Sequence, residues 1–174
     1  DNVKLEHVPF GLVQGEDGKK FKTRSGDTIK LKDLLDEAIE RTEMDMISRS
    51  NNSILSAEDK EIARVIGIGA VKYADLSMNR ESNYRFSYKK MLSLSGNTAP
   101  YMLYAYVRIM GIRRKAEETF NNNIYNNIKN STDNDEINFI LETPEEIALI
   151  KHILRFEDIL REVERDLYPN KICE

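Results

Sequence analysis

A glycine- and lysine-rich stretch near the N-terminus has the residue types that a phosphate-transferring site requires. Residues 15–27 read G-E-D-G-K-K-F-K-T-R-S-G-D, and their cations are Lys19, Lys20, Lys22 and Arg24. Cations beside small and hydroxyl residues can close over a triphosphate and stabilise charge on the leaving pyrophosphate. The spacing is not that of a Walker loop, so composition alone leaves a solvated basic hairpin as the alternative.

A second candidate site lies on a helix that we expect to begin at Asn97 and to run to about Phe120. Asn97 can cap this helix, and Pro100 is tolerated in its first turn. At about 100° per residue, one face of the helix carries Tyr101, Tyr104, Arg108 and Lys115. Exposed tyrosines beside arginine can stack a nucleic-acid base and hold its phosphate. The alternative is that both tyrosines pack under a neighbouring helix and that Arg108 pairs with an acid.

The remaining residue types favour no further chemistry. Cys173 is the only cysteine, and the two histidines, His7 and His152, are far apart in the sequence. They predict neither a disulfide framework nor a metal site, and a reducing, cytosolic compartment fits best. The adjacent carboxylates Glu145–Glu146 and Glu157–Asp158 are typical of helix starts and solvated faces. No apolar run is long enough to span a bilayer.

The net charge of −4 conceals a strong asymmetry along the chain. Residues 60–115 contain 11 Lys and Arg against 3 Asp and Glu, whereas residues 116–174 contain 6 against 14. Six of the eight tyrosines also fall in the basic segment. Interleaved cations and aromatic rings suit a single-stranded or looped RNA, because phosphates need cations and unstacked bases need flat faces. A solvated face over a tyrosine-rich core explains the same pattern equally well.

Helical periodicity dominates the sequence from residue 31 onward. Apolar residues recur at intervals of three and four from Leu31, which predicts a one-sided helix that ends near Ser48. Ser56 with Asp59 predicts the cap of the next helix, which we expect to end near Asn79. The expected buried stripe of that helix is Ile62, Ile66, Gly69, Tyr73 and Leu76. Small residues beside the stripe leave room for a close neighbour; they are Gly67, Ala70 and Ala74.

Other patterns complete the expected elements. Thr143–Pro144–Glu145–Glu146 predicts the start of a further helix. Two short strands, in Val8–Gln14 and at Thr28–Ile29, predict a β-hairpin, and the asparagine-rich residues 121–138 predict a mobile insertion. The arc of the Asn97 helix opposite its tyrosine face is apolar, and we expect it to face the core. That arc comprises Met102, Leu103, Tyr106, Ile109 and Met110.

Four blocks of the sequence resemble the arginyl-tRNA synthetase family, and they occur in the order found in the family. They are His7–Ala38, Val71–Arg80 (V-K-Y-A-D-L-S-M-N-R), Phe86–Ile109 (with G-N-T-A-P-Y-M-L-Y-A-Y-V-R-I) and His152–Leu160. The resemblance covers nearly all of the chain except the asparagine-rich stretch. It implies a class I aminoacyl-tRNA synthetase, which activates arginine with ATP, releases pyrophosphate and transfers arginine to the 3′ end of tRNA(Arg).

The resemblance implies roles for two sets of residues. Many class I enzymes carry a K-M-S-K-S loop that stabilises the leaving pyrophosphate, and Phe21–Ser25 occupies the corresponding place. Pyrophosphate stabilisation then falls to Lys19, Lys20, Lys22 and Arg24, and ATP binding to Lys22, Thr23, Arg24 and Ser25. Tyrosines three apart in the block after Asn97 are associated with anticodon recognition. The residues implied for tRNA anticodon binding are Asn97, Tyr101, Tyr104 and Arg108.

The expected fold is mainly α. It is part of a helical anticodon-binding bundle, preceded by a short β and loop remnant of a Rossmann-type catalytic domain. We expect the end of the catalytic domain in residues 1–55, a connecting helical region in 56–96, and the first part of the anticodon-binding domain in 97–174. The parent enzyme would use ATP with its Mg²⁺, without a dedicated metal site in this chain. We expect a cytoplasmic protein with no membrane or DNA partner.

The family's H-I-G-H-type ATP motif and arginine pocket lie upstream of the matching blocks and are not in this sequence. We therefore expect a fragment that is catalytically incomplete alone; arginine-dependent ATP–pyrophosphate exchange by the 174-residue chain would contradict this. The alternative is a free-standing helical RNA-binding module derived from a synthetase. Apolar stripes without partner helices would favour self-association.

Overall fold

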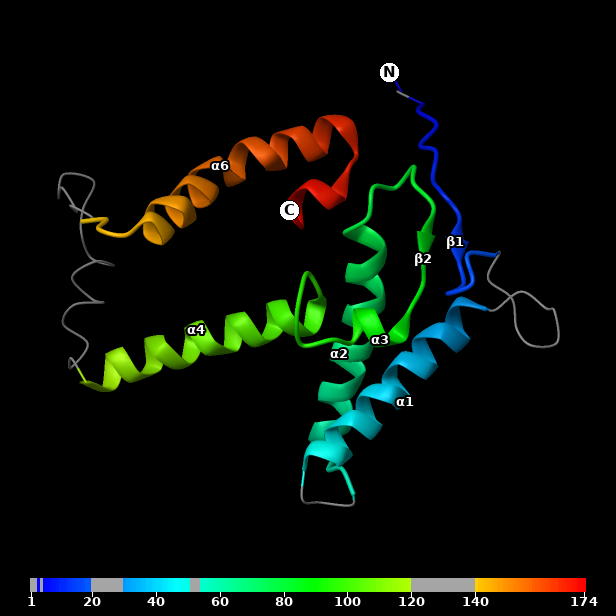
Figure 1. The fold of residues 1–174 in the computed structure, drawn as a ribbon, viewed down its shortest axis with the longest axis horizontal. Coiled ribbons are helices and arrows are strands. Elements are labelled where there is room, and N and C mark those ends of the chain that lie inside the picture. The colour runs from blue at the N-terminus through cyan, green and yellow to red at the C-terminus, as the bar shows by residue number, and fades with distance from the viewer. Residues whose placement is uncertain (1–2, 4, 20–29, 51–53, 120–139) are drawn as a thin grey trace. The chain divides into compact units, whose positions relative to one another are not determined.

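The computed structural model describes residues 3, 5–19, 30–50, 54–119 and 140–174, and its described part is mostly helical (Figure 1). The elements are β1 (Val13–Gln14), α1 (Leu31–Arg49), α2 (Ala57–Leu76), β2 (Tyr84–Arg85), α3 (Tyr88–Met91), α4 (Ala99–Thr119), α6 (Pro144–Asp166) and the 3-10 helix η1 (Pro169–Ile172). The expected mainly α fold is confirmed. The chain divides into two compact units, Asp1–Met102 with Ile159–Glu174, and Leu103–Asp158.

Capping residues determine the start of α2, as the sequence predicts. The Ser56 hydroxyl accepts a hydrogen bond from the Asp59 amide at 3.1 Å, and the Asp59 carboxylate accepts one from the Ser56 amide at 3.1 Å. This reciprocal pair satisfies amide groups that the first turn of a helix leaves unpaired. Hydrogen bonds from the Ser56 hydroxyl and amide also lower the pKa of Asp59. The helix ends at Leu76, slightly before the expected end near Asn79.

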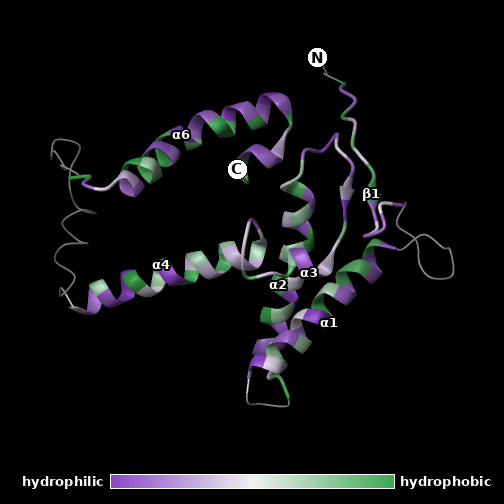
Figure 2. Cartoon of the chain, viewed as in Figure 1, coloured by the Kyte–Doolittle hydropathy of each residue, from purple (hydrophilic) through white to green (hydrophobic). Residues whose placement is uncertain are grey.

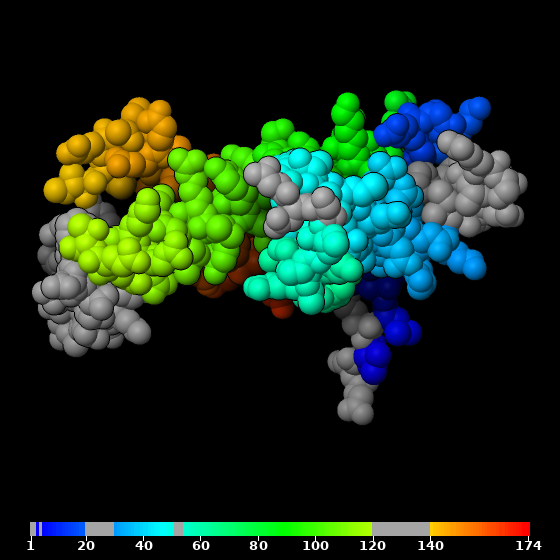
Figure 3. All heavy atoms as spheres, turned by 90° about the horizontal axis from the view of Figure 1, so that it is seen from below, coloured from blue at the N-terminus to red at the C-terminus, as the bar shows by residue number. Residues whose placement is uncertain are grey.

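Small residues bring α1 and α2 into close contact. A Cβ added to Gly67 would lie 2.9 Å from the carbonyl carbon and oxygen of Ala38, so the two helix backbones nearly touch there. Ala38 is fully buried, and the Thr42 hydroxyl donates to its carbonyl at 2.8 Å. Figure 3 shows the side chains of α1 and of the first turns of α2 in contact. Such a close backbone approach requires residues without bulky side chains.

The buried face of α2 differs from the apolar stripe that the sequence predicts. Ile62 and Leu76 of that stripe are 44% and 48% exposed. The buried residues of the helix are Ala63, Gly67, Ala70 and Val71. The predicted stripe is therefore wrong, because the close approach of α1 selects small side chains rather than the most apolar ones. The prediction that Gly67 and Ala70 leave room for a neighbour is confirmed.

The two short strands form a parallel sheet, in which Val13 lies opposite Tyr84 and Gln14 opposite Arg85. This pairing differs from the expected hairpin, whose second strand, Thr28–Ile29, lies outside the described residues. Parallel strands require a crossover connection, and here α1 and α2 lie between the two strands in the chain. The sequence does not predict β2, since a strand of two residues shows no periodicity.

The core of the first unit lies where α1, α2 and the segment from β2 to α3 meet. Its buried residues are Ala38, Ala70, Val71, Phe86 and Met91. The rings of Phe86 and Tyr88 pack edge to face with their centroids 4.9 Å apart. The Arg41 guanidinium lies over the Tyr88 ring at 4.7 Å, and the Tyr88 hydroxyl donates to the Leu34 carbonyl at 3.2 Å. These contacts hold α3 against α1.

Arg80 connects three segments of the first unit. Its guanidinium donates to the Pro9 carbonyl at 2.6 Å and to the Leu167 carbonyl at 2.9 Å. It also lies 4.4 Å from the centre of the Tyr168 ring, whose hydroxyl donates to Glu81 at 2.7 Å. Leu167 adopts a φ of 58°, a left-handed conformation just after α6. The N-terminal segment, the turn after α2 and the end of α6 are therefore held at one point.

The second unit consists of most of α4 and most of α6. The Glu146 amide donates to the Thr143 hydroxyl at 3.3 Å, and the Thr143 amide donates to the Glu146 carboxylate at 3.0 Å, so the predicted start of α6 is confirmed. None of the described helices combines the length and hydropathy that a membrane-spanning segment requires. The predicted insertion at residues 121–138 lies outside the described residues.

The apolar arc of α4 is exposed, although we expected it to face the core. Ile109 is 64% exposed and Met110 38%. Figure 2 shows hydrophobic segments along α4 and α6, and Leu154 on α6 is 73% exposed. The expectation that this arc is buried is therefore wrong for the described chain. Self-association through these surfaces stays a prediction.

Candidate phosphate-binding and nucleic-acid-binding sites

A tight turn follows β1 and leads into the predicted phosphate loop. The Gly15 amide donates to the Lys19 carbonyl at 2.9 Å, and the Gly18 amide donates to the Gly15 carbonyl at 2.9 Å. Gly18 adopts a φ of 75°, and a Cβ at this position would lie 3.3 Å from the Arg85 guanidinium. Lys19 is exposed at the end of this turn. The other predicted loop residues lie outside the described residues; they are Lys20, Lys22, Thr23, Arg24 and Ser25.

The predicted RNA-contacting face of α4 is exposed along the helix. Tyr101 is 40% exposed and Tyr104 53%. The Arg108 guanidinium donates to the Tyr104 hydroxyl at 3.4 Å, which keeps the cation one helical turn from the ring. Both rings and the guanidinium are accessible, which is the arrangement that stacking on a base and contact with its phosphate require.

Asn97 is not the capping residue of α4. Thr98 takes that place, because its hydroxyl accepts a hydrogen bond from the Tyr101 amide at 3.3 Å. The Asn97 side chain instead accepts a hydrogen bond from the Tyr73 hydroxyl and donates one to the Cys173 carbonyl at 2.9 Å. Its amide therefore connects the loop before α4 to α2 and to the segment after η1. A contact between Asn97 and the anticodon stays a prediction.

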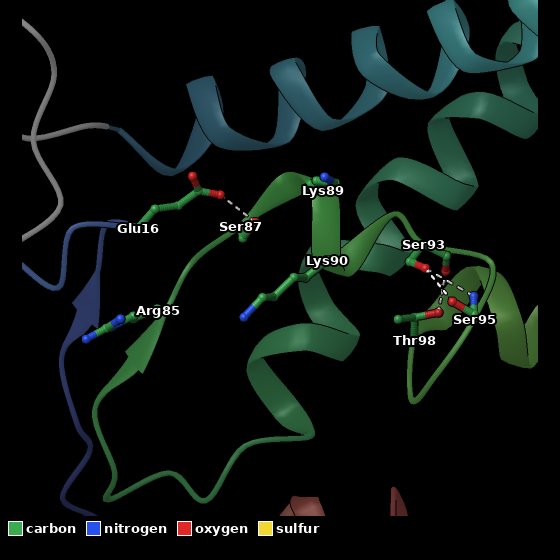
Figure 4. A pocket seen from close by; sticks show the side chains of 8 residues that line it. All are labelled: Glu16, Arg85, Ser87, Lys89, Lys90, Ser93, Ser95 and Thr98. Carbon is green, nitrogen blue, oxygen red and sulfur yellow. Dashed lines mark hydrogen bonds between the residues drawn. The ribbon is translucent and has the colours of Figure 1, made fainter.

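A hollow of about 670 Å³ lies beside α3 in the first unit (Figure 4). Its cations are Arg85, Lys89 and Lys90. Its other lining residues are Glu16, Ser87, Ser93, Ser95 and Thr98. In Figure 4 the Glu16 side chain reaches Ser87, and Lys90 extends into the open space beside them. These cations lie in the basic segment of the sequence, but they match no motif that would predict a site there.

Two phenols next to these cations in the sequence are neutral at physiological pH. Burial raises the pKa of both, Tyr84 and Tyr88. The hydrogen bond to Asp75 adds to the effect at Tyr84, and the charge of Glu37 adds to it at Tyr88. The charges at the hollow are therefore those of its three cations and of Glu16.

Within the described ranges, no cluster of three or more His, Cys, Asp or Glu side chains could hold a metal ion. Among the described residues, the side chains that could bind a nucleotide carry a positive charge or a hydroxyl group. Lys19 is the described member of the predicted ATP-contacting loop, and its exposed side chain at the end of an ordered turn fits contact with a phosphate.

Two family models match the chain in succession. Residues 1–88 match "tRNA synthetases class I (R), catalytic domain", and residues 102–174 match the "DALR anticodon binding domain". These matches define the class of the protein: a catalytic segment of a class I tRNA synthetase joined to an anticodon-binding segment. Since the first match covers half of the chain, the chain belongs to the arginyl class I tRNA synthetase family. The division at residues 55 and 96 stays a prediction.

Curated relatives agree with this family. The chain is 52% identical over 182 residues to an arginine–tRNA ligase of Cyanothece sp. and 54% identical over 182 residues to one of Nostoc sp.. Each match covers 100% of this chain and 28% of the relative. The chain therefore spans little more than a quarter of the length of these relatives.

Solved structures share the fold. Arginyl-tRNA synthetase from Plasmodium falciparum aligns with a TM-score of 0.67 and 28% identity, over 96% of this chain and 25% of that chain. The Thermus thermophilus arginyl-tRNA synthetase aligns with a TM-score of 0.63 and 23% identity, over 93% of this chain and 23% of that chain, and supports the fold alone. The family that the four sequence blocks indicate is thus confirmed.

Proposed function

We propose that this chain supplies two parts of an arginine–tRNA ligase: a loop that stabilises pyrophosphate and part of the surface that binds the anticodon of tRNA(Arg). The complete enzyme would activate arginine with ATP and transfer it to tRNA(Arg) in the cytoplasm. The observation that carries the proposal is the exposed face of Tyr101, Tyr104 and Arg108 in a segment that matches an anticodon-binding domain.

The loop that begins at Lys19 would act by electrostatic stabilisation. ATP, with its Mg²⁺, supplies the phosphoanhydride bond that breaks when arginine is activated. The loop cations are Lys19, Lys20, Lys22 and Arg24. They would place positive charge where the pyrophosphate leaves, which lowers the energy of the transition state. The hydroxyls of Thr23 and Ser25 would donate to phosphate oxygens. The turn from Gly15 to Lys19 supports this role, because it fixes the start of the loop.

The α4 face would read unstacked anticodon bases. Tyr101 and Tyr104 would each stack on a base, and Arg108 would contact the adjacent phosphate. Asn97 would contribute mainly by holding the loop before the helix in place. Stacking on one base contributes roughly 1–3 kcal/mol of binding free energy, so the loss of either tyrosine should weaken the affinity measurably.

The test is fluorescence anisotropy of labelled tRNA(Arg) and of a non-cognate tRNA, titrated with the 174-residue chain at low and physiological salt. Tyr101→Ala and Tyr104→Ala should each weaken binding of tRNA(Arg) about 5- to 150-fold. Tyr106→Ala is the matched control, because Tyr106 is 61% exposed on the opposite arc of the same helix. The proposal fails if all three variants bind both tRNAs as the unsubstituted chain does.

A further inference from the structure

The hollow beside α3 has the size of a ligand site, and none of its lining residues belongs to the tyrosine face of α4. Its volume of about 670 Å³ falls within the range of roughly 300–1,000 Å³ that small-molecule sites occupy. That space can hold one nucleotide unit. All of its lining residues belong to the first unit of the chain, so its shape does not depend on how the two units are arranged.

The cations of the hollow are available to a ligand. Among the described residues, the side chains of Arg85, Lys89 and Lys90 have no ion-pair or hydrogen-bond partner. Arg41 and Arg64, on α1 and α2, are instead each paired with a glutamate at 2.7 Å. Figure 4 shows Lys90 extending into the hollow, and Arg85 and Lys89 also line it. The hollow therefore offers cationic side chains without an ion-pair partner in the described chain to an anionic ligand.

The hollow also contains the carboxylate of Glu16. Its negative charge would repel a ligand that carries nothing but an anionic group. The Ser87 hydroxyl donates to one Glu16 oxygen at 2.5 Å, and Ser87 is buried, so the carboxylate is held in place. The other Glu16 oxygen has no hydrogen-bond partner among the described residues, and it can accept a hydrogen bond from a ligand. A ligand that suits this site carries a negative charge at one end and a hydroxyl donor at the other.

The loop before α4 completes the wall with ordered hydroxyl groups. The Thr98 hydroxyl donates to the Ser93 carbonyl at 2.6 Å, and the hydroxyls of Ser93 and Ser95 are 3.0 Å apart. These internal hydrogen bonds give the wall a defined shape before any ligand binds, so less conformational entropy is lost on binding.

We propose that this hollow binds one ribose–phosphate unit of an RNA strand, with the phosphate against Arg85 and Lys90 and the 2′-hydroxyl donating to Glu16. The phosphodiester supplies the single negative charge, and the 2′-hydroxyl is the group that separates RNA from DNA. The contact involves no base, so it is independent of sequence. The inference rests on the proposed function for its choice of RNA as the partner, but it concerns other residues and predicts a different specificity.

The experiment measures binding of the full 174-residue chain to a labelled single-stranded RNA of mixed sequence. A DNA strand of the same sequence, with deoxyuridine in place of thymidine, is measured in parallel. Arg85→Gln and Lys90→Gln should each weaken RNA binding about fivefold and reduce the slope of log affinity against log salt by about one. Lys72→Gln is the matched control, because Lys72 is an exposed lysine of α2 outside the hollow and should give little change. Circular dichroism of each variant checks that it is folded.

Glu16→Ala tests the ribose contact. The unsubstituted chain should prefer RNA to DNA, and the variant should lose this preference while binding DNA at least as tightly. Retention of the RNA preference in Glu16→Ala, or Arg85 and Lys90 variants that bind like the Lys72 control, would overturn the inference. Displacement of the RNA by an equimolar amount of AMP would assign the hollow to free nucleotides instead and would also overturn it.

The two proposals fail separately. If the tyrosine variants lose tRNA(Arg) while the Arg85 and Lys90 variants bind normally, only the ribose–phosphate site is rejected. If the Arg85 and Lys90 variants weaken binding to every RNA while the tyrosine variants bind normally, only the anticodon surface is rejected.

Discussion

At the scale of single residues, the Tyr84 phenol couples the stability of the first unit to pH. Its hydroxyl donates to Asp75 at 2.8 Å, and burial followed by this hydrogen bond raises its pKa above the ordinary value of 10.0. The folded chain therefore keeps a proton that the unfolded chain releases above pH 10. The stability from this group is complete below pH 10 and is lost as the pH rises toward the folded-state pKa.

Tyr84→Phe tests this coupling. The variant should lose about 1 kcal/mol of stability at neutral pH, the net value of a typical hydrogen bond. Above pH 10 its stability should fall less steeply than that of the unsubstituted chain. The remaining slope comes from other groups whose pKa is raised, among them Tyr73 and Tyr88. Urea unfolding at a series of pH values measures both effects. Parallel pH profiles for the two chains would contradict the prediction.

The residues of the two candidate sites differ in how far the sequence could predict them. The face of Tyr101, Tyr104 and Arg108 follows from helical periodicity, which depends only on spacing within one element. The role of Asn97 could not be predicted, because its partners, Tyr73 and Cys173, lie 24 and 76 residues away. The hollow beside α3 could not be predicted from the sequence either. Glu16 and Ser87 are 71 residues apart, and nothing local indicates that they meet.

At the scale of elements, the contact between α1 and α2 should respond in opposite ways to two glycine substitutions on α2. Gly67→Ala should destabilise the chain by about 1–3 kcal/mol, because its Cβ would meet the Ala38 backbone at 2.9 Å and the helices would have to separate. Gly69→Ala should instead stabilise it by about 0.5–1 kcal/mol, since no atom lies within 4 Å and alanine favours a helix.

The midpoints of urea unfolding for the two variants measure this difference. Both substitutions add one methyl group to the same helix, so helix propensity alone would shift the two midpoints in the same direction. Stabilisation by Gly67→Ala would show that the two helices are not in backbone contact.

The helices could be predicted where their start depends on residues that are close together in the sequence. The starts of α2 and α6 follow from Ser56 and Thr143, each with an acidic residue three positions later. The buried face of α2 was not predictable from hydropathy, because a close helix contact buries Ala63 and Gly67 and leaves Ile62 exposed. β2 depends on pairing with a strand about 70 residues earlier, which no short window of sequence shows.

At the scale of the whole molecule, Arg80 should control how firmly the distant segments of the first unit are held together. Arg80→Lys keeps the charge but cannot donate to the Pro9 and Leu167 carbonyls with one planar group. We expect a loss of about 2 kcal/mol, in the range for hydrogen bonds to charged groups. Hydrogen exchange should accelerate at the amides of both Gly11 and Leu167, which are now hydrogen-bonded.

Arg64→Lys is the matched control, because Arg64 forms an exposed ion pair with Glu61, and its replacement should change stability little. Faster exchange at only one of the two amides in Arg80→Lys would show that the segments are held independently.

The Arg80 guanidinium joins segments that are translated at different times. Leu167 is translated 158 residues after Pro9, whose carbonyl the same guanidinium binds. At about 5–20 residues per second, the wait is roughly 10 to 30 s. During that time Arg80 lacks two of its partners, the Leu167 carbonyl and the Tyr168 ring. The unit whose synthesis begins first is thus the last to become complete.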